Sequence, residues 1–386
     1  MGASYASEEF QLSLAGAELL ALEPVHRGRC RFELAFRVSV PGRYLVDFVW
    51  TREDYAAVRD DVAAHPQAVV SRPLGWRFVE LGNAAEARKA HASALSGEGL
   101  PSCVGLRHEM HGRWLRASLP PSPDGLFDRH VVPGKHRQLA FVRMRDYAWA
   151  PWDCRLPSLH ALAYELRCMD VRGKGLQLEI SGDSHGLRVL KTMGLFLCAD
   201  VAKFRNFTIK EAHSYRYDLA DCDSPPGLVV FNAIYYGENL LQALAPASAR
   251  LTLINFGSHR MQQPAPFAVR YRAPLEALVA KWSRLPRAVR TRSVVWYDMP
   301  VSPFDRGGFV TGYKDGRTLA RCRLWNALAR ERMRGVDGLL RVPLGAMSAP
   351  FYYNNPNNDG HYDPKLYLEV ARAAAAMTCD STGGVR

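Results

Sequence analysis

The chain has 386 residues, enough for two or three domains of roughly 150 residues, and its 48% hydrophobic and 23% charged residues exclude a disordered or fibrous protein. Its net charge of +12 is spread over scattered arginines and lysines, and no helix-turn-helix, zinc-finger or RNA-recognition signature is present, so we expect no nucleic-acid partner. No apolar run approaches the roughly 18 residues that span a bilayer, and the first ten residues lack the basic and apolar regions of a signal peptide.

The N-terminal quarter of the chain has the pattern of short β-strands. Apolar and polar residues alternate in four segments, which are residues 10–16, 30–40, 43–50 and 75–82. They are rich in Val, Phe and Tyr, and turn residues separate them. Short strands at a spacing of about 8–12 residues predict a β-sandwich, which we place at residues 1–95.

Two changes of composition follow. The segment NAAEARKAHASALSGEG is rich in Ala, Ser and Gly, and predicts a linker or a short helix, so the first boundary falls near residue 95. Residues 96–155 are aromatic and rich in proline, and we expect them to form an irregular lead-in segment. None of the eight cysteines forms a C-x-x-C pair, so neither a zinc ribbon nor thioredoxin-like chemistry is predicted.

Residues 156–386 alternate between strand and helix patterns. The predicted strands are 175–180, 227–236, 292–300 and 338–345. The predicted helices begin near residue 187 and cover 239–245, 273–285, 317–335 and 364–377. Four β-α alternations predict an α/β domain, with a mostly parallel sheet and helices on both of its faces.

The stretch SGDSHG (181–186) lies where a predicted strand ends and a helix begins. Ligands bind beyond the carboxyl ends of strands in such sheets. Gly182 permits a tight turn, and Ser184 is close to the helix N-terminus, whose free N–H groups and dipole favour a developing oxyanion. One interpretation makes Ser184 a nucleophile, whereas another makes Asp183 and His185 the D-x-H block of a metallophosphoesterase.

A nucleophilic serine needs a base, and the C-terminal segment NNPNNDGHYDP offers one. His361 precedes the last predicted helix, with Asp359 two residues before it and Asn358 three before it. These groups could complete a Ser-His-Asp triad with Ser184, and either Asp359 or Asn358 could orient the imidazole. Asn232, at the end of the next predicted strand, could donate its amide to the oxyanion.

The metal interpretation needs more ligands. A two-metal phosphoesterase would also carry G-D-x-x-D, then G-N-H-[DE] and later histidines. No G-D-x-x-D follows Ser184, and the blocks FGSHRM and DGHYD do not match the later ones. We therefore predict no metal site, and metallophosphoesterase is kept as an alternative.

At these residues the chain resembles the SGNH hydrolase superfamily, and within it the PC-esterase group. That group includes trichome-birefringence-like polysaccharide O-acetyltransferases, the sialate O-acetyltransferase catalytic domain, and the neurexophilin-and-PC-esterase family. The likeness rests on YAWAPWDCRLP, VRGKGLQLEISGDSHGLRVL, GLVVFNAIYY and NDGHY, and covers about residues 100–380. It implies a flavodoxin-like three-layer α/β fold, and the β-rich N-terminal domain resembles immunoglobulin- or filamin-like modules.

The resemblance also implies roles for single residues. Ser184 would be the nucleophile, His361 the base and Asp359 its orienting acid. The residues expected to bind the oxyanion or the substrate are Asn232, Gly182, Asp183, His185 and Arg188. No cofactor is implied.

We therefore expect a serine-dependent esterase or O-acetyltransferase that acts on O-acyl groups, acetyl above all, of a carbohydrate or glycoconjugate. A transferase would also need an acetyl donor. Members of the group work in the secretory pathway, in the Golgi, or outside the cell, so we expect the same of this chain. Ile234 replaces a family glycine, and the Asp-His spacing differs, so a catalytically impaired glycan-binding protein is the other alternative.

Overall fold

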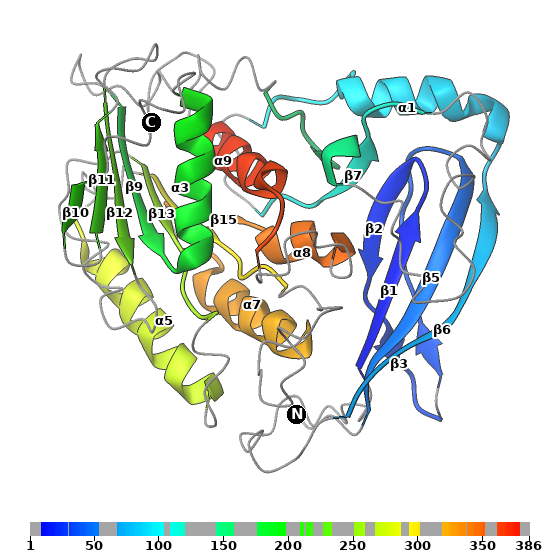
Figure 1. Ribbon diagram of the computed structural model, residues 1–386, viewed down its shortest axis with the longest axis horizontal. Coiled ribbons are helices and arrows are strands. Elements are labelled where there is room, and N and C mark those ends of the chain that lie inside the picture. Colours follow the sequence, from blue (N-terminus) through cyan, green and yellow to red (C-terminus); the bar gives the residue numbers. More distant parts are fainter. Residues whose placement is uncertain are drawn as a thin grey trace.

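The computed structural model shows two sheets, with helices packed around one of them (Figure 1). It describes residues 9–29, 31–53, 68–103, 109–119, 144–157, 176–197, 209–211, 214–218, 227–233, 251–258, 267–286, 293–301, 319–336, 338–351 and 361–378. None of the helices in these ranges is both long and apolar enough to cross a membrane.

The first sheet is antiparallel and has six strands. In spatial order they are β6 (Ala68–Leu81), β5 (Gly42–Glu53), β1 (Glu9–Ala15), β2 (Glu18–Leu22), β7 (Gly112–Arg116) and β8 (Tyr147–Pro151). A separate hairpin pairs β3 (Val25–His26) with β4 (Phe32–Glu33). The β-rich N-terminal region is thus confirmed, and three of its four predicted strands correspond to β1, β5 and β6.

The fourth predicted strand, residues 30–40, is wrong except for the two residues of β4. At the end of this segment the backbone is bound by a side chain and not by a strand. Oε1 of the buried Glu18 accepts the N–H groups of Ser39 and Val40 at 2.9 and 3.2 Å. Side-chain-to-backbone hydrogen bonds compete with a strand ladder.

The segment 96–155, expected to be irregular, contributes β7 and β8 to the antiparallel sheet. Trp114 and Trp149 lie opposite each other in this pair, and both side chains are buried, with ring centroids 5.7 Å apart. Aromatic cross-strand pairs stabilise a sheet by packing on one face. The lead-in segment therefore belongs structurally to the N-terminal sheet.

The second sheet has seven strands. In spatial order they are β10 (Ile209–Glu211), β11 (Ser214–Asp218), β12 (Gly227–Ala233), β9 (Leu176–Gly182), β13 (Leu251–Ile254), β14 (Ser293–Tyr297) and β15 (Leu339–Val342). Strands β12, β9, β13, β14 and β15 are parallel to one another. Strand β11 pairs antiparallel with β12, and β10 pairs antiparallel with β11. Numbered along the chain, the parallel strands have the order 2-1-3-4-5, with β9 as the first.

Helices cover both faces of this sheet, as predicted. On one face, α3 (Ser184–Leu197) and α9 (Pro364–Thr378) lie side by side over a shared apolar core (Figure 1). On the other face, α5 (Phe267–Arg284) and α7 (Leu319–Met333) pack over a second core. The expected α/β architecture is therefore confirmed. Helix α3 begins at residue 184, three residues earlier than predicted.

The two sheets meet through the short helix α8 (Leu344–Ser348) and the turn after it. Gln11 Nε2 of β1 donates to the carbonyl of Ala349 at 3.0 Å. Trp114 Nε1 of β7 donates to the carbonyl of Met347 at 2.8 Å. Both bonds are buried and join residues more than 230 positions apart. The antiparallel sheet therefore holds the segment that follows β15 in place by hydrogen bonds.

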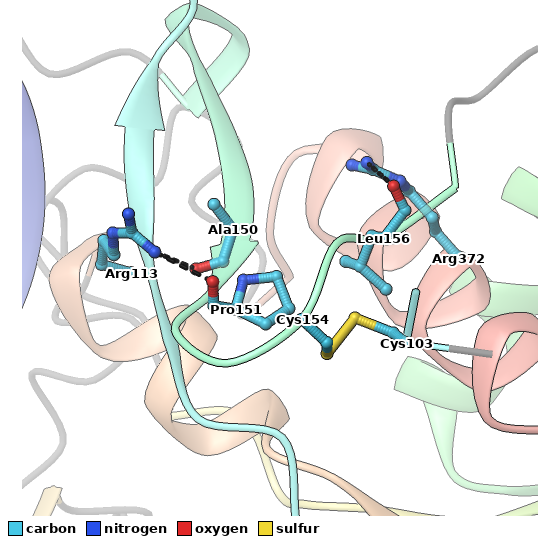
Figure 2. The surroundings of a disulfide bond; sticks show 7 residues. All are labelled: Cys103, Arg113, Ala150, Pro151, Cys154, Leu156 and Arg372. Carbon is cyan, nitrogen blue, oxygen red and sulfur yellow. Dashed lines mark hydrogen bonds between the residues drawn. A yellow bond between two sulfur atoms is a disulfide. The ribbon is translucent and has the colours of Figure 1, made fainter. Parts of the chain in front are cut away.

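A disulfide joins Cys103 to Cys154, which are 51 residues apart in the sequence. Figure 2 shows that the chain continues from Cys154 to Leu156, whose carbonyl accepts a hydrogen bond from Arg372 of α9 at 3.4 Å. Arg372 also donates to the carbonyl of Pro157. The bonds from Arg372 thus attach α9 to the two residues that follow shortly after Cys154.

Candidate functional site

Ser184 is the first residue of α3, directly beyond the carboxyl end of β9. Asp183 stands at the N-cap position: its Oδ1 accepts the N–H of His185 at 2.9 Å, and its carbonyl accepts the N–H of Leu187 at 3.2 Å. Asp183 and His185 are buried, whereas Ser184 is only half-buried. The turn therefore presents the serine and keeps its two neighbours inside the protein.

Gly182 makes this turn possible by its lack of a side chain. A Cβ atom there would lie 2.6 Å from the Tyr297 hydroxyl and 3.2 Å from the Asn255 carbonyl oxygen, both closer than van der Waals contact allows. Tyr297 is fully buried, and this burial, with smaller effects of Asp183 and Tyr367, raises the pKa of its phenol well above 10. A neutral phenol therefore packs directly under the predicted nucleophile turn.

Two asparagines flank the end of β9. Asn232, predicted as an oxyanion donor, pairs with Ser181 in the register of β12 and β9, although its side chain lies outside the described part of the structure. On the other side, the N–H of Asn255 donates to the Ser181 carbonyl at 2.9 Å. The amide of the buried Asn255 donates to the Tyr297 carbonyl at 2.6 Å, and an amide carries a second hydrogen.

Asn255 was missed by the sequence analysis because β13 itself was missed. The signal exists: the run LTLIN ends a short apolar segment with asparagine, as VVFN does at Asn232. In a 2-1-3-4-5 sheet the crevice opens between the first and third strands, which here are β9 and β13. Asn255 is therefore the asparagine on the side where a ligand is expected to bind.

His361 lies three residues before α9, as predicted. Its half-buried ring has its centroid 5.1 Å from that of His185, and the rings are tilted by 56°. Asp363 fixes where α9 begins, because its Oδ1 caps the N–H of Lys365 at 2.9 Å. The structure thus brings the predicted base to the first turn of α3, although His361 and Ser184 are about 180 residues apart in the sequence.

One predicted site feature, the group that orients His361, lies outside the described residues, whereas Arg188 lies within them. Asp359 and Asn358, the alternative orienting residues, lie beyond the described residues, so that choice stays a prediction. Arg188 lies one turn into α3 and is half-buried.

The buried residues next to the site form a hydrogen-bonded group. The hydroxyl of Tyr367, in the first turns of α9, lies 3.0 Å from Nδ1 of His185 and accepts the N–H of Tyr362 at 3.2 Å. The hydroxyl of Tyr362 donates to the carbonyl of Val301, which follows β14. His185, Tyr362 and Tyr367 are all at most 2% exposed. His185, predicted as a substrate contact, is therefore buried against α9.

Two of these contacts bear on the interpretation of the same turn as a metal site. Asp183 Oδ1 caps α3 and His185 Nδ1 lies against Tyr367, so two atoms of the D-x-H block are engaged within the protein. Within the described ranges, no three His, Cys, Asp or Glu side chains gather closely enough to hold a metal ion.

Comparison with known proteins leaves the family open. No model of a known protein family matches the chain, and no curated protein matches it. The resemblance to SGNH hydrolases therefore rests on the sequence motifs.

Proposed function

We propose that the protein is a serine-dependent esterase or O-acetyltransferase of SGNH type that acts on O-acyl groups, acetyl above all, of a carbohydrate. One observation carries the proposal. Ser184 begins α3 at the carboxyl end of the central strand β9, and the ring of His361 packs against the residue that follows this serine. A serine at a helix N-terminus with an imidazole beside it has the parts of an acyl-transfer site.

The proposed reaction begins with proton transfer from Ser184 Oγ to His361 while Oγ attacks the acyl carbonyl carbon. The oxyanion that forms accepts hydrogen bonds from the Ser184 N–H and from an asparagine amide, Asn232 or Asn255. The bond from the acyl carbon to the leaving group then breaks, and His361 returns its proton to that group, which is the sugar oxygen in an esterase and the acetyl donor in a transferase. Asp359, or Asn358, would orient the imidazole.

The acyl-enzyme then has two fates. Attack by water would release a carboxylic acid and make the protein an esterase, whereas attack by a sugar hydroxyl would make it a transferase that takes acetyl from a separate donor. In both cases His361 removes the proton from the attacking hydroxyl, and Ser184 leaves with that proton. The same residues serve both reactions.

We also propose that the protein works in the secretory pathway or outside the cell. The Cys103–Cys154 disulfide supports this, because such bonds persist mainly in oxidising compartments. That the antiparallel sheet belongs to an immunoglobulin- or filamin-like module remains part of the proposal.

The test of this function is the Ser184→Ala variant. It should lower the release of 4-nitrophenol from 4-nitrophenyl acetate at least about 1,000-fold and abolish labelling by a fluorophosphonate, since no hydroxyl is left to acylate. Ser93→Ala, which alters an exposed serine of helix α1 (Ala87–Ser96), is the matched control and should label like the wild type.

Other outcomes would favour the alternatives. Hydrolysis at the wild-type rate by Ser184→Ala contradicts a serine nucleophile. Phosphate-ester hydrolysis that survives this substitution and is lost with a chelator would support a metallophosphoesterase. A folded wild type that binds glycans but neither hydrolyses esters nor labels would support a glycan-binding protein.

A further inference from the structure

A single buried hydroxyl connects the two halves of the candidate site. Tyr367 Oη accepts the N–H of Tyr362 at 3.2 Å and lies 3.0 Å from Nδ1 of His185. Tyr362 directly follows His361, and His185 directly follows Ser184. The hydroxyl is therefore one residue away from each member of the proposed nucleophile–base pair.

We call the two contacts of Tyr367 Oη, with Tyr362 and with His185, the bridge. The buried position of these residues keeps it rigid. Tyr367, Tyr362 and His185 are at most 2% exposed, so water does not compete for their hydrogen bonds. The bridge spans the contact between α3 and α9, which lie side by side over one core (Figure 1). The Tyr362 hydroxyl is bonded to Val301, which holds the same segment from its other side.

The bonding of the Tyr367 hydroxyl fits either neutral form of His185. A backbone N–H can only donate, so Tyr367 Oη is the acceptor toward Tyr362. A hydroxyl has two lone pairs and one hydrogen, so Oη can donate to Nδ1 of His185 or accept from an Nδ1–H. In both cases the same oxygen contacts both neighbours of the proposed pair.

We propose that Tyr367 is a positioning residue that sets the geometry between Ser184 and His361 through this bridge. It touches neither the substrate nor the reacting atoms. Its hydroxyl fixes the His361–Tyr362 segment to the first turn of α3, so that the imidazole stays within reach of the serine. This inference rests on the proposed function for its catalytic consequence, whereas the bridge itself can be tested without any activity.

The first arm of the test measures the reaction. Tyr367→Phe removes only the hydroxyl and should slow fluorophosphonate labelling of Ser184 and lower kcat for 4-nitrophenyl acetate about 10- to 100-fold, as small misplacements of reacting groups do. KM should change less than about twofold, because substrate contacts stay in place. Tyr44→Phe is the matched control: its buried hydroxyl donates to the Val40 carbonyl at 2.7 Å in the antiparallel region, and both rates should equal those of the wild type.

The second arm measures the bridge in the wild type. The Tyr362 amide should exchange slowly with solvent, because its hydrogen is bonded to a buried acceptor. Tyr367→Phe removes this acceptor and should speed exchange at the Tyr362 amide at least about 10-fold. It should also shift the His185 Nδ1 resonance in ¹⁵N-histidine spectra, a signal identified by its loss in His185→Gln. Tyr44→Phe should change neither.

The outcomes separate the two proposals. A wild type that labels, together with a Tyr367→Phe variant that labels equally fast, overturns the positioning role and leaves the proposed function intact. A wild type that does not label overturns the proposed function, and exchange at the Tyr362 amide then decides on the bridge alone. Fast exchange at this amide in the wild type overturns the bridge, even if Tyr367→Phe does not fold.

Discussion

The two halves of the candidate site are held in place in different ways. The nucleophile turn is fixed by strand pairing and close packing: β9 is paired on both sides, Asp183 caps α3, and Tyr297 leaves no room for a side chain at Gly182. The His361 segment is fixed by two hydroxyl groups: that of Tyr362 bonds the Val301 carbonyl, and that of Tyr367 on α9 accepts the Tyr362 N–H. We therefore expect changes near the turn to act through sterics, and changes around α9 to act through position.

The largest effect is expected from removing the disulfide between Cys103 and Cys154. In the chain-entropy estimate, a bridge over 51 residues stabilises by about 4 kcal/mol, so Cys103→Ser with Cys154→Ser should lower the free energy of unfolding by roughly that amount. Arg372 of α9 is bonded to the carbonyls that follow Cys154, so amide exchange should rise more in α9 than in α3. Urea denaturation and hydrogen exchange measure the two effects.

The matched control is the wild type with and without a reductant. The reduced wild type should unfold like the double variant, and the double variant should not respond to reductant. An equal rise of exchange in α3 and α9 would contradict the difference between the two halves of the site.

The next effect concerns the turn. Gly182→Ala places a Cβ 2.6 Å from the Tyr297 hydroxyl and should destabilise by about 1–3 kcal/mol, the usual range for overpacking. Among the described residues this hydroxyl has no hydrogen-bond partner, so Tyr297→Phe alone should be nearly neutral. In the double variant the oxygen is absent, and most of the lost stability should return. An equal loss in both backgrounds would place the strain elsewhere, for example at the Asn255 carbonyl.

The nucleophile turn is also the half that the sequence predicted better. A tight turn at Gly182, with Ser184 close to a helix N-terminus, was predicted from the apolar run before it. The capping role of Asp183 was not predicted. The approach of His361 could be predicted only from its place before the last helix. Its distance from α3 depends on packing that no local pattern encodes.

The omissions have the same cause. Strand β13 has only four residues, too few for a period to show, although both of its neighbours are parallel strands of the central sheet. Asn255 was missed together with β13. Tyr367 lies in a correctly predicted helix, and nothing in the sequence singled it out. Its hydroxyl acquires a role only because His185, 182 positions away, lies opposite. The fold class was predictable from local pattern, whereas these contacts needed the three-dimensional structure.

The smallest expected effect distinguishes the two tyrosines of the His361 segment. Tyr362→Phe removes the bond to the Val301 carbonyl and should lower the free energy of unfolding by about 1 kcal/mol, measured by urea denaturation. The Tyr362 N–H is part of the backbone and keeps its bond to Tyr367, so the tie to α3 survives. The rate of fluorophosphonate labelling should therefore stay within about threefold of the wild-type rate. Such a change corresponds to less than about 1.4 kcal/mol in activation free energy, the value for a tenfold change. If Tyr362→Phe slows labelling as much as Tyr367→Phe does, then the anchor to Val301 controls His361 equally, and α9 is not the main support of the segment.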